Sequence, residues 1–402
     1  MTVPASRPGP APGAAGAGET HAPSVPPRLA DLTTMRVGGP AASYLEATTE
    51  AELIDAVRQA DAEGTPLLVI GGGSNLLVAD EGFDGLVLRD IRSGIDADAS
   101  SACSGGNLTV PAGQDWDELV ATAVAEEWSG IEALSGIPGG TGATPVQNVG
   151  AYGQEVSQTL ASVRVYDRAT SRIRTLAASE LGLGYRTSIL KRSRLEDEAR
   201  WHPTGRYVVL EVSFQLRLAS LSAPVRYAEL ARRLGVDVEA RVPSSEVRAA
   251  VLELRGSKGM VLDAADHDTW SAGSFFTNPV LPIEDADRLL PADAPRYPVA
   301  DHSLVGWNAC AAPAVDGLVK TSAAWLIDHA GFSKGHRGGG ASGGSAASGP
   351  AALSSKHVLA LTNRGGATAA DMVALAREIR DGVRQRFGVD LEPEPVLIGV
   401  EL

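Results

Sequence analysis

A glycine-rich run over residues 135–153 constrains this chain more than any other segment. It holds six glycines and two prolines. Glycine adds backbone entropy and proline removes a hydrogen-bond donor, so the run cannot form a regular helix or a central strand. Its bare N–H groups can approach an anionic oxygen, which predicts a phosphate or pyrophosphate ligand. The alternative is a surface linker, which the apolar residues Val146, Val149 and Tyr152 disfavour.

Composition limits the possible functions of the chain. Its 402 residues allow two or more domains, and the net charge of −14 argues against a general nucleic-acid binder, which needs a basic face. Cys103 and Cys310 form no CxxC motif, so we expect neither a zinc site nor a disulfide framework, and a reducing cytoplasm is the simplest location. The histidines show no metal-ligand spacing, so we expect no metal.

Two segments have the composition of flexible chain. Residues 1–28 are rich in Pro, Ala and Gly but lack the basic start and apolar core of a signal peptide or a membrane helix. We interpret them as a disordered tail. Residues 337–350 hold almost nothing but Gly, Ala and Ser, which predicts a flexible loop.

The remaining pattern predicts an α+β chain. Thr49 and Glu52 form a capping box that starts a helix ending at Gly64, and the strand 66–70 then leads into Gly71–Asn75. β-Branched runs predict strands at 163–167 and 207–214. Helical periodicity predicts further helices, which dominate the second half, at residues 116–127, 227–234, 244–255, 322–330 and 368–387.

The glycine run matches neither of the common phosphate-binding motifs. The Walker pattern GxxxxGK[ST] is absent, and Pro145 stands where the third glycine of GxGxxG should fall. We therefore expect the anion site to be built from two separate loops, Gly71–Asn75 and Pro138–Gly153.

These two loops resemble the flavin-binding half of the UDP-N-acetylmuramate dehydrogenase family, also called UDP-N-acetylenolpyruvoylglucosamine reductase. Four further segments match the same family in the same order: Gly184–Lys191, Arg255–Asp263, Ser271–Pro279 and Leu391–Pro395. The resemblance runs from about Leu29 to the C-terminus and covers nearly the whole ordered chain.

The resemblance implies a fold and a reaction. It implies a two-lobed FAD-binding domain of the non-Rossmann, vanillyl-alcohol-oxidase-like (PCMH) type over residues 29–218. A smaller α+β substrate domain then covers residues 219–390, and residues 391–402 return to the active site. The implied reaction reduces UDP-N-acetylglucosamine enolpyruvate to UDP-N-acetylmuramate with NADPH, in peptidoglycan precursor synthesis. Hydride from N5 of reduced, noncovalent FAD adds to the terminal vinyl carbon.

Three residues match the catalytic residues of the family. Arg186 would stabilise the carboxylate and the developing negative charge, because a guanidinium stays charged and grips a carboxylate in two places. Ser274 would donate the proton, a task that a weakly acidic hydroxyl can perform only toward a strongly basic carbanion. Glu394 would be the second acid, with a raised pKa or with its charge balanced by Arg186. Glu392 should face the other side of an extended strand and serves as a negative control.

The ligand-binding residues follow from the same matches. The expected flavin contacts are Gly71, Gly72, Gly73, Ser74, Asn75, Gly139, Gly140, Thr141, Gly142, Ala143, Gln147, Asn148, Gly150, Ala151 and Tyr152. The expected substrate contacts are Tyr185, Tyr227, Lys258, Asn278, Lys320 and His329. Of these, Tyr227 resembles a tyrosine that closes over substrate, while core packing is the competing explanation for Tyr227 and for His329.

The only expected partner is the small-molecule substrate, UDP-N-acetylglucosamine enolpyruvate, and we expect no nucleic-acid partner and no membrane span. We expect the protein to be a monomer in the cytoplasm. The residues alone leave two alternative functions open. The first is a sugar or alcohol oxidase on the same flavin-binding fold. The second is a catalytically silent flavin or UDP-sugar binding protein.

Overall fold

A computed structural model describes residues 25–98, 105–301, 306, 312–338 and 349–402. Most of the predicted tail, the centre of the predicted 337–350 loop and both cysteines lie outside these ranges. In the part of the chain that the structure describes, no helix is long and apolar enough to cross a membrane. Within the same ranges, no group of His, Cys, Asp or Glu side chains could hold a metal ion.

The first lobe is a small parallel sheet covered by one long helix. Strand β4 lies between β1 and β2, with all pairs parallel. Helix α2 begins at the predicted Thr49–Glu52 capping box and ends at Gly64, whose φ is +68°. Its apolar face packs on the sheet through Leu53 and Val57, which are fully buried. The elements are α1 Leu29–Leu32, β1 Ala41–Ala47, α2 Glu50–Glu63, β2 Leu67–Ile70, β3 Leu76–Val78 and β4 Phe83–Asp90.

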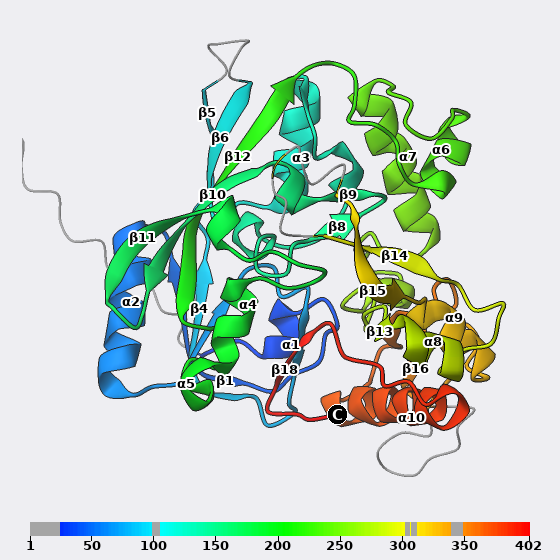
Figure 1. The fold of residues 1–402 in the computed structure, drawn as a ribbon. Helices are drawn as coiled ribbons and strands as arrows, with labels where there is room; N and C mark the ends of the chain where they lie inside the picture. Colours follow the sequence, from blue (N-terminus) through cyan, green and yellow to red (C-terminus); the bar gives the residue numbers. More distant parts are fainter. Residues whose placement is uncertain (1–24, 99–104, 302–305, 307–311, 339–348) are drawn as a thin grey trace, which may run out of the picture.

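The second lobe is a larger antiparallel sheet in the strand order β11-β10-β12-β6-β5, with β7 also pairing with β12 (Figure 1). Helix α3 packs on this sheet through Trp116, whose ring lies 5.9 Å from that of Phe214. The elements are β5 Asp96–Asp98, β6 Gly106–Pro111, α3 Trp116–Ala125, β7 Trp128–Ser129, β8 Gly150–Ala151, β9 Gln154–Glu155, β10 Leu160–Asp167, β11 Arg172–Ala177, α4 Ile189–Arg192, α5 Glu196–Ala199 and β12 Tyr207–Leu218.

A helical pair, α6 and α7, follows the second lobe and has its own apolar cluster, which includes Val225, Leu230 and Val251. In Figure 1 it lies at the upper right, in green, above the C-terminal part of the chain. Helix α6 spans Ala228–Leu234 and α7 spans Ser244–Ser257.

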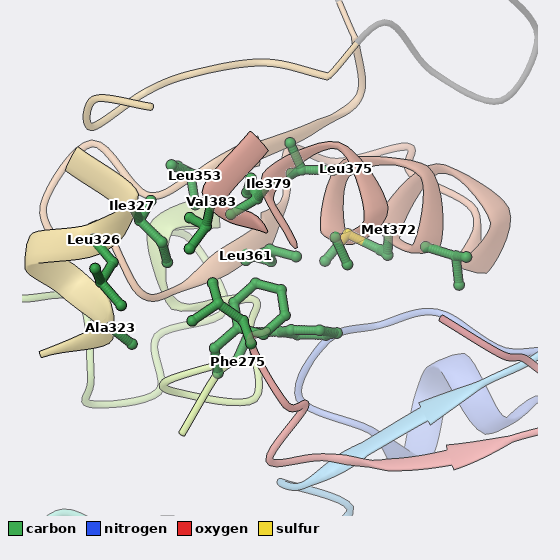
Figure 2. Packing of buried hydrophobic residues seen from close by; sticks show 14 of the residues in the cluster. Phe275, Ala323, Leu326, Ile327, Leu353, Leu361, Met372, Leu375, Ile379 and Val383 are labelled. Carbon is green, nitrogen blue, oxygen red and sulfur yellow. The ribbon is translucent and has the colours of Figure 1, made fainter. Parts of the chain in front are cut away.

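The C-terminal part packs helices around short strands. Figure 2 shows how side chains of α9 and α10 meet Phe275, Leu353 and Leu361 in one apolar core. Helix α10 starts at a capping box of Thr368 and Asp371 and ends at Gly388. The elements are β13 Val280–Pro282, α8 Ile283–Leu289, β14 Tyr297–Ala300, β15 Ala314–Lys320, α9 Ala323–His329, β16 Ala351–Leu353, β17 Leu361–Asn363, α10 Ala369–Phe387 and β18 Val396–Ile398.

The last strand leaves the C-terminal part and returns to the first lobe. Strand β18 pairs in parallel with β3, and the red ribbon of Figure 1 enters the blue region there. The preceding residues 391–395 contain no regular strand. Pro393 forms an isolated bridge with Phe276, and the N–H of Glu394 donates to the carbonyl of Phe275 at 2.8 Å.

The observed elements correct several sequence predictions. The helices expected at 227–234, 322–330 and 368–387 begin one residue later, since Tyr227, Ser322 and Thr368 are N-caps. The helix expected at 116–127 ends two residues earlier, at Ala125, and that expected at 322–330 ends one residue earlier, at His329. Helix α7 runs two residues beyond 255. The strand expected at 207–214 extends to Leu218. Of the observed strands, the sequence predicted only β2, β10 and β12. It missed longer strands such as β1 and β4 as well as the six short strands β13 to β18, because short runs carry little periodicity.

Candidate active site

Two glycine loops meet at the centre of the structure. Ser74 donates a hydrogen bond from Oγ to the carbonyl of Pro138 at 2.8 Å, and Asn75 donates from Nδ2 to Oε1 of Gln147 at 2.9 Å. A Cβ atom on Gly72 would lie 2.7 Å from Cα of Gly139. The backbones therefore touch, and only glycine fits at this contact.

The contact leaves free donors in the first loop. In the described ranges, no hydrogen bond uses the backbone N–H of Gly72, Gly73 or Ser74. These three residues belong to the lining of a cavity of about 520 Å³, to which both loops contribute. Consecutive unpaired N–H groups in a turn form a concave site for an anion.

Arg186 lies beside these loops in a strained backbone conformation. Its φ is +55°, and its neighbours Asn148 and Tyr152 also have positive φ, of 48° and 47°. For side chains other than glycine this region costs free energy and clusters at functional sites. The Arg186 guanidinium donates to the carbonyl of Gly150 at 2.8 Å and to that of Asn148 at 3.3 Å. The loop carbonyls thus fix the orientation of the guanidinium.

Glu394 lies next to Arg186 on the cavity wall. Oε1 of Glu394 lies 3.1 Å from Nε of Arg186, an ionic contact in which the N–H does not point at the oxygen. The same Oε1 accepts a hydrogen bond from Nε2 of Gln147 at 3.3 Å. Burial raises the pKa of Glu394, while Arg186 and Lys191 act in the opposite direction. Glu392, in contrast, is exposed, as its predicted role as a negative control requires.

Ser274 reaches the same cavity from the C-terminal part. It follows Gly273, whose φ is +74°, and precedes Phe275 and Phe276, which are fully buried in the core. The carbonyl of Phe275 accepts the hydrogen bond from the N–H of Glu394. The structure therefore brings Arg186, Ser274 and Glu394 to one cavity from three distant segments.

Not every predicted flavin contact lines this cavity. Thr141 and Asn148 are buried within the loop, where Oγ1 of Thr141 donates to the carbonyl of Gln114 and Oδ1 of Asn148 accepts from the N–H of Ser157. Both side chains hold the loop in shape. The other predicted flavin contacts do line the cavity: Gly71, Gly72, Gly73, Ser74, Asn75, Gly139, Gly140, Gly142, Ala143, Gln147, Gly150, Ala151 and Tyr152.

The predicted substrate contacts fall into two groups. Tyr227 and Lys258 line the cavity, and the Tyr227 ring lies edge-on to that of Tyr152 at 5.5 Å. Tyr185, Asn278 and Lys320 are not among the residues that line this cavity and form a cluster of their own. There the Lys320 ammonium lies 4.6 Å from the Tyr185 ring, and Oη of Tyr185 accepts from the N–H of Asn278 at 3.3 Å.

The structure does not bring His329 to the site. Its ring is exposed at the end of α9, stacks on Trp325 at 3.8 Å and contacts the Trp325 carbonyl through Nδ1 at 2.9 Å. The packing explanation accounts for this residue.

Sequence reasoning missed several polar residues of the cavity wall. Lys191 is a half-buried lysine whose Nζ donates to Oε1 of Gln147 at 3.4 Å, and burial lowers its pKa to about 8. Burial likewise lowers the pKa of His357, to about 4. Arg194 and Arg255 also line the wall. Lys191 and Arg255 lie inside the matched motifs, so membership of these motifs was the available signal.

Comparison with known proteins shows matches to two domain families. Residues 264–398 match the model of the UDP-N-acetylenolpyruvoylglucosamine reductase C-terminal domain, and residues 41–177 match that of an FAD binding domain. The protein named UDP-N-acetylenolpyruvoylglucosamine reductase from Saccharopolyspora erythraea is 53% identical over 390 residues, covering 97% of this chain and 100% of the relative. The one from Nocardia farcinica is 55% identical over 376 residues, covering 93% and 89%.

A solved structure shows the same similarity. The crystal structure of UDP-N-acetylenolpyruvylglucosamine reductase from Thermus caldophilus superimposes with a TM-score of 0.58 at 25% identity, covering 92% of this chain and 97% of that one. The two domain matches, the identity over almost the full length and the shared fold all agree. The chain belongs to the UDP-N-acetylenolpyruvoylglucosamine reductase family.

Proposed function

We propose that Arg186, Ser274 and Glu394 carry out the reduction that defines this family. The chain is an FAD-dependent oxidoreductase that reduces UDP-N-acetylglucosamine enolpyruvate with NADPH in peptidoglycan precursor synthesis. The observation that carries our assignment is the convergence of an arginine, a buried glutamate and a serine on one cavity wall beside the paired glycine loops.

The residues of the paired loops fit an FAD pyrophosphate. The N–H groups of Gly72, Gly73 and Ser74 are free donors, and a Cβ at Gly72 would close the approach between the loops. We propose that these groups hold the pyrophosphate and that Gln147 and Gly150 lie nearer the reacting atoms, since both contact the Arg186–Glu394 pair. Bound FAD supplies a hydride that it has received from NADPH.

The reduction adds a hydride and a proton across the vinyl double bond of the substrate. Hydride addition to the terminal carbon leaves an electron pair, and so negative charge, on the adjacent carbon and its carboxylate. Arg186 stabilises that charge from a guanidinium already fixed by two loop carbonyls, so little reorganisation is needed. Ser274 then donates its hydroxyl proton to the adjacent carbon, which completes the C–H bond, and regains a proton from solvent.

Glu394 acts as a neutral acid next to the carboxylate of the substrate. An ionised glutamate would repel the developing charge, but burial raises its pKa and so favours the neutral acid. Oε1 already contacts the Arg186 guanidinium and accepts a hydrogen bond from Gln147. We therefore propose that the acidic proton resides on Oε2 and points to the substrate.

The proposed substrate contacts are Tyr227 and Lys258 on the cavity wall and the cluster of Tyr185, Asn278 and Lys320, in which the Tyr185 ring lies 5.5 Å from Cζ of Arg186. His329 stays a sequence prediction without geometric support. The domain boundaries at residues 218 and 390, the monomeric state and the cytoplasmic location belong to this proposal as well.

The loop contact generates the first prediction. Gly72→Ala places a Cβ 2.7 Å from Cα of Gly139. Overpacking of this kind costs about 1–3 kcal/mol, because the two loops must move apart. We therefore expect FAD to bind about tenfold more weakly. The measurement is flavin absorbance per protein after dilution and gel filtration. Gly256→Ala is the matched control, because a Cβ there meets nothing within 4 Å. Full flavin retention by Gly72→Ala would contradict the proposal that the paired glycine loops hold the FAD pyrophosphate.

The second prediction concerns the proton. Ser274→Ala should slow reoxidation of the reduced flavin by the enolpyruvyl substrate by about 10²–10⁴-fold, since general acid catalysis contributes that much. Reduction by NADPH should stay near the wild-type rate. Anaerobic stopped-flow absorbance measures both half-reactions. Exposed Ser220→Ala is the control, and equal slowing of both half-reactions in Ser274→Ala would remove the proton-donor role.

The third prediction separates Glu394 from Glu392. Glu394→Gln should slow substrate-driven reoxidation by about 10²-fold, whereas exposed Glu392→Gln should leave it unchanged. In the wild type the rate should fall as pH rises through the raised pKa of Glu394, because the acid then becomes a carboxylate. The pH profile of Glu394→Gln should lack this decrease. Its persistence in that variant would refute the neutral-acid role.

A further inference from the structure

Lys258, a cation of the cavity wall, already has an anionic partner within the chain. Lys258 lies at the C-terminal end of α7 and lines the cavity. Its Nζ is 2.5 Å from Oε2 of Glu229 and 5.7 Å from the centre of the Tyr152 ring. Glu229 belongs to the first turn of α6 and is not part of the cavity wall. The carboxylate therefore reaches Lys258 from outside the cavity.

The neighbouring groups leave Lys258 as the accessible charge. Arg255 lies deeper, where its Nη2 donates to the carbonyl of Met260 at 2.7 Å and burial lowers its pKa. His357 is neutral at pH 7, because burial and then the charge of Lys258 lower its pKa to about 4. Lys258 is 28% exposed at the side chain and Glu229 is 35% exposed. Both charged groups can thus separate without entering the protein interior.

A diphosphate that binds Lys258 must compete with Glu229. A phosphate oxygen in contact with Nζ would lie within about 6 Å of the carboxylate, where like charges repel each other. The inference rests on the proposed role of Lys258 toward the nucleotide substrate. We propose that Glu229 is an internal counter-ion that competes with the substrate's phosphates for Lys258 and so determines the affinity for the nucleotide.

The test is UDP binding to the full-length, FAD-loaded, oxidised enzyme by isothermal titration calorimetry. Glu229→Gln should bind UDP about fivefold more tightly than the wild type, because an ion pair of this exposure no longer has to be broken. Its affinity should also fall more steeply with added salt, since a free cation then meets the phosphates. Lys258→Met should bind more weakly, and adding Glu229→Gln to it should have no further effect.

The matched control is Glu253→Gln, which removes a carboxylate from α7 that pairs with Arg233 of α6 rather than with Lys258. Its UDP affinity and salt dependence should equal those of the wild type. Unchanged or weaker binding by Glu229→Gln would overturn the inference alone, as would the same gain in the Lys258→Met background. Wild-type affinity in Lys258→Met would overturn the proposed role of Lys258 together with this inference.

Discussion

The active site depends on one pairing, the parallel ladder between β3 and β18. Strand β3 begins directly after the Gly71–Asn75 loop, and the N–H of Val396 donates to the carbonyl of Asn75 at 2.9 Å. Two residues earlier, the N–H of Glu394 donates to the carbonyl of Phe275. One short C-terminal segment thus ties the first glycine loop to the segment that carries Ser274. Glu394 itself donates one of these hydrogen bonds and lies two residues from the other, so its position beside Arg186 follows from the backbone.

The site concentrates cations in an acidic protein. Although the net charge is −14, the cavity wall carries Arg186, Lys191, Arg194, Arg255 and Lys258. Burial lowers the pKa of Lys191 to about 8, which shows the cost of keeping a charge there. Phosphates and a carboxylate would offset this cost, because they would meet cations that are already oriented. The local charge therefore predicts the ligands better than the global charge does.

Sequence reasoning succeeded where the physics is local. The capping box at Thr49, the stop at Gly64 and the stripe of α10 all follow from contacts within a few residues, and the structure confirms them. It failed at the short strands β13 to β18, whose stability comes from partners far along the chain. The matched motifs supplied Arg186, Ser274 and Glu394, yet a motif contains no distances. It could not place His329 away from the cavity or assign Lys258 a partner on α6.

Anaerobic spectroscopy of the wild-type enzyme tests the central claim most directly. NADPH should bleach the flavin, and the enolpyruvyl sugar nucleotide, added without oxygen, should restore the oxidised spectrum with one substrate consumed per flavin. Reoxidation only on admission of oxygen would indicate an oxidase on this fold and contradict the account. Absence of bleaching by NADPH would indicate a flavin-binding protein without this activity and contradict it equally.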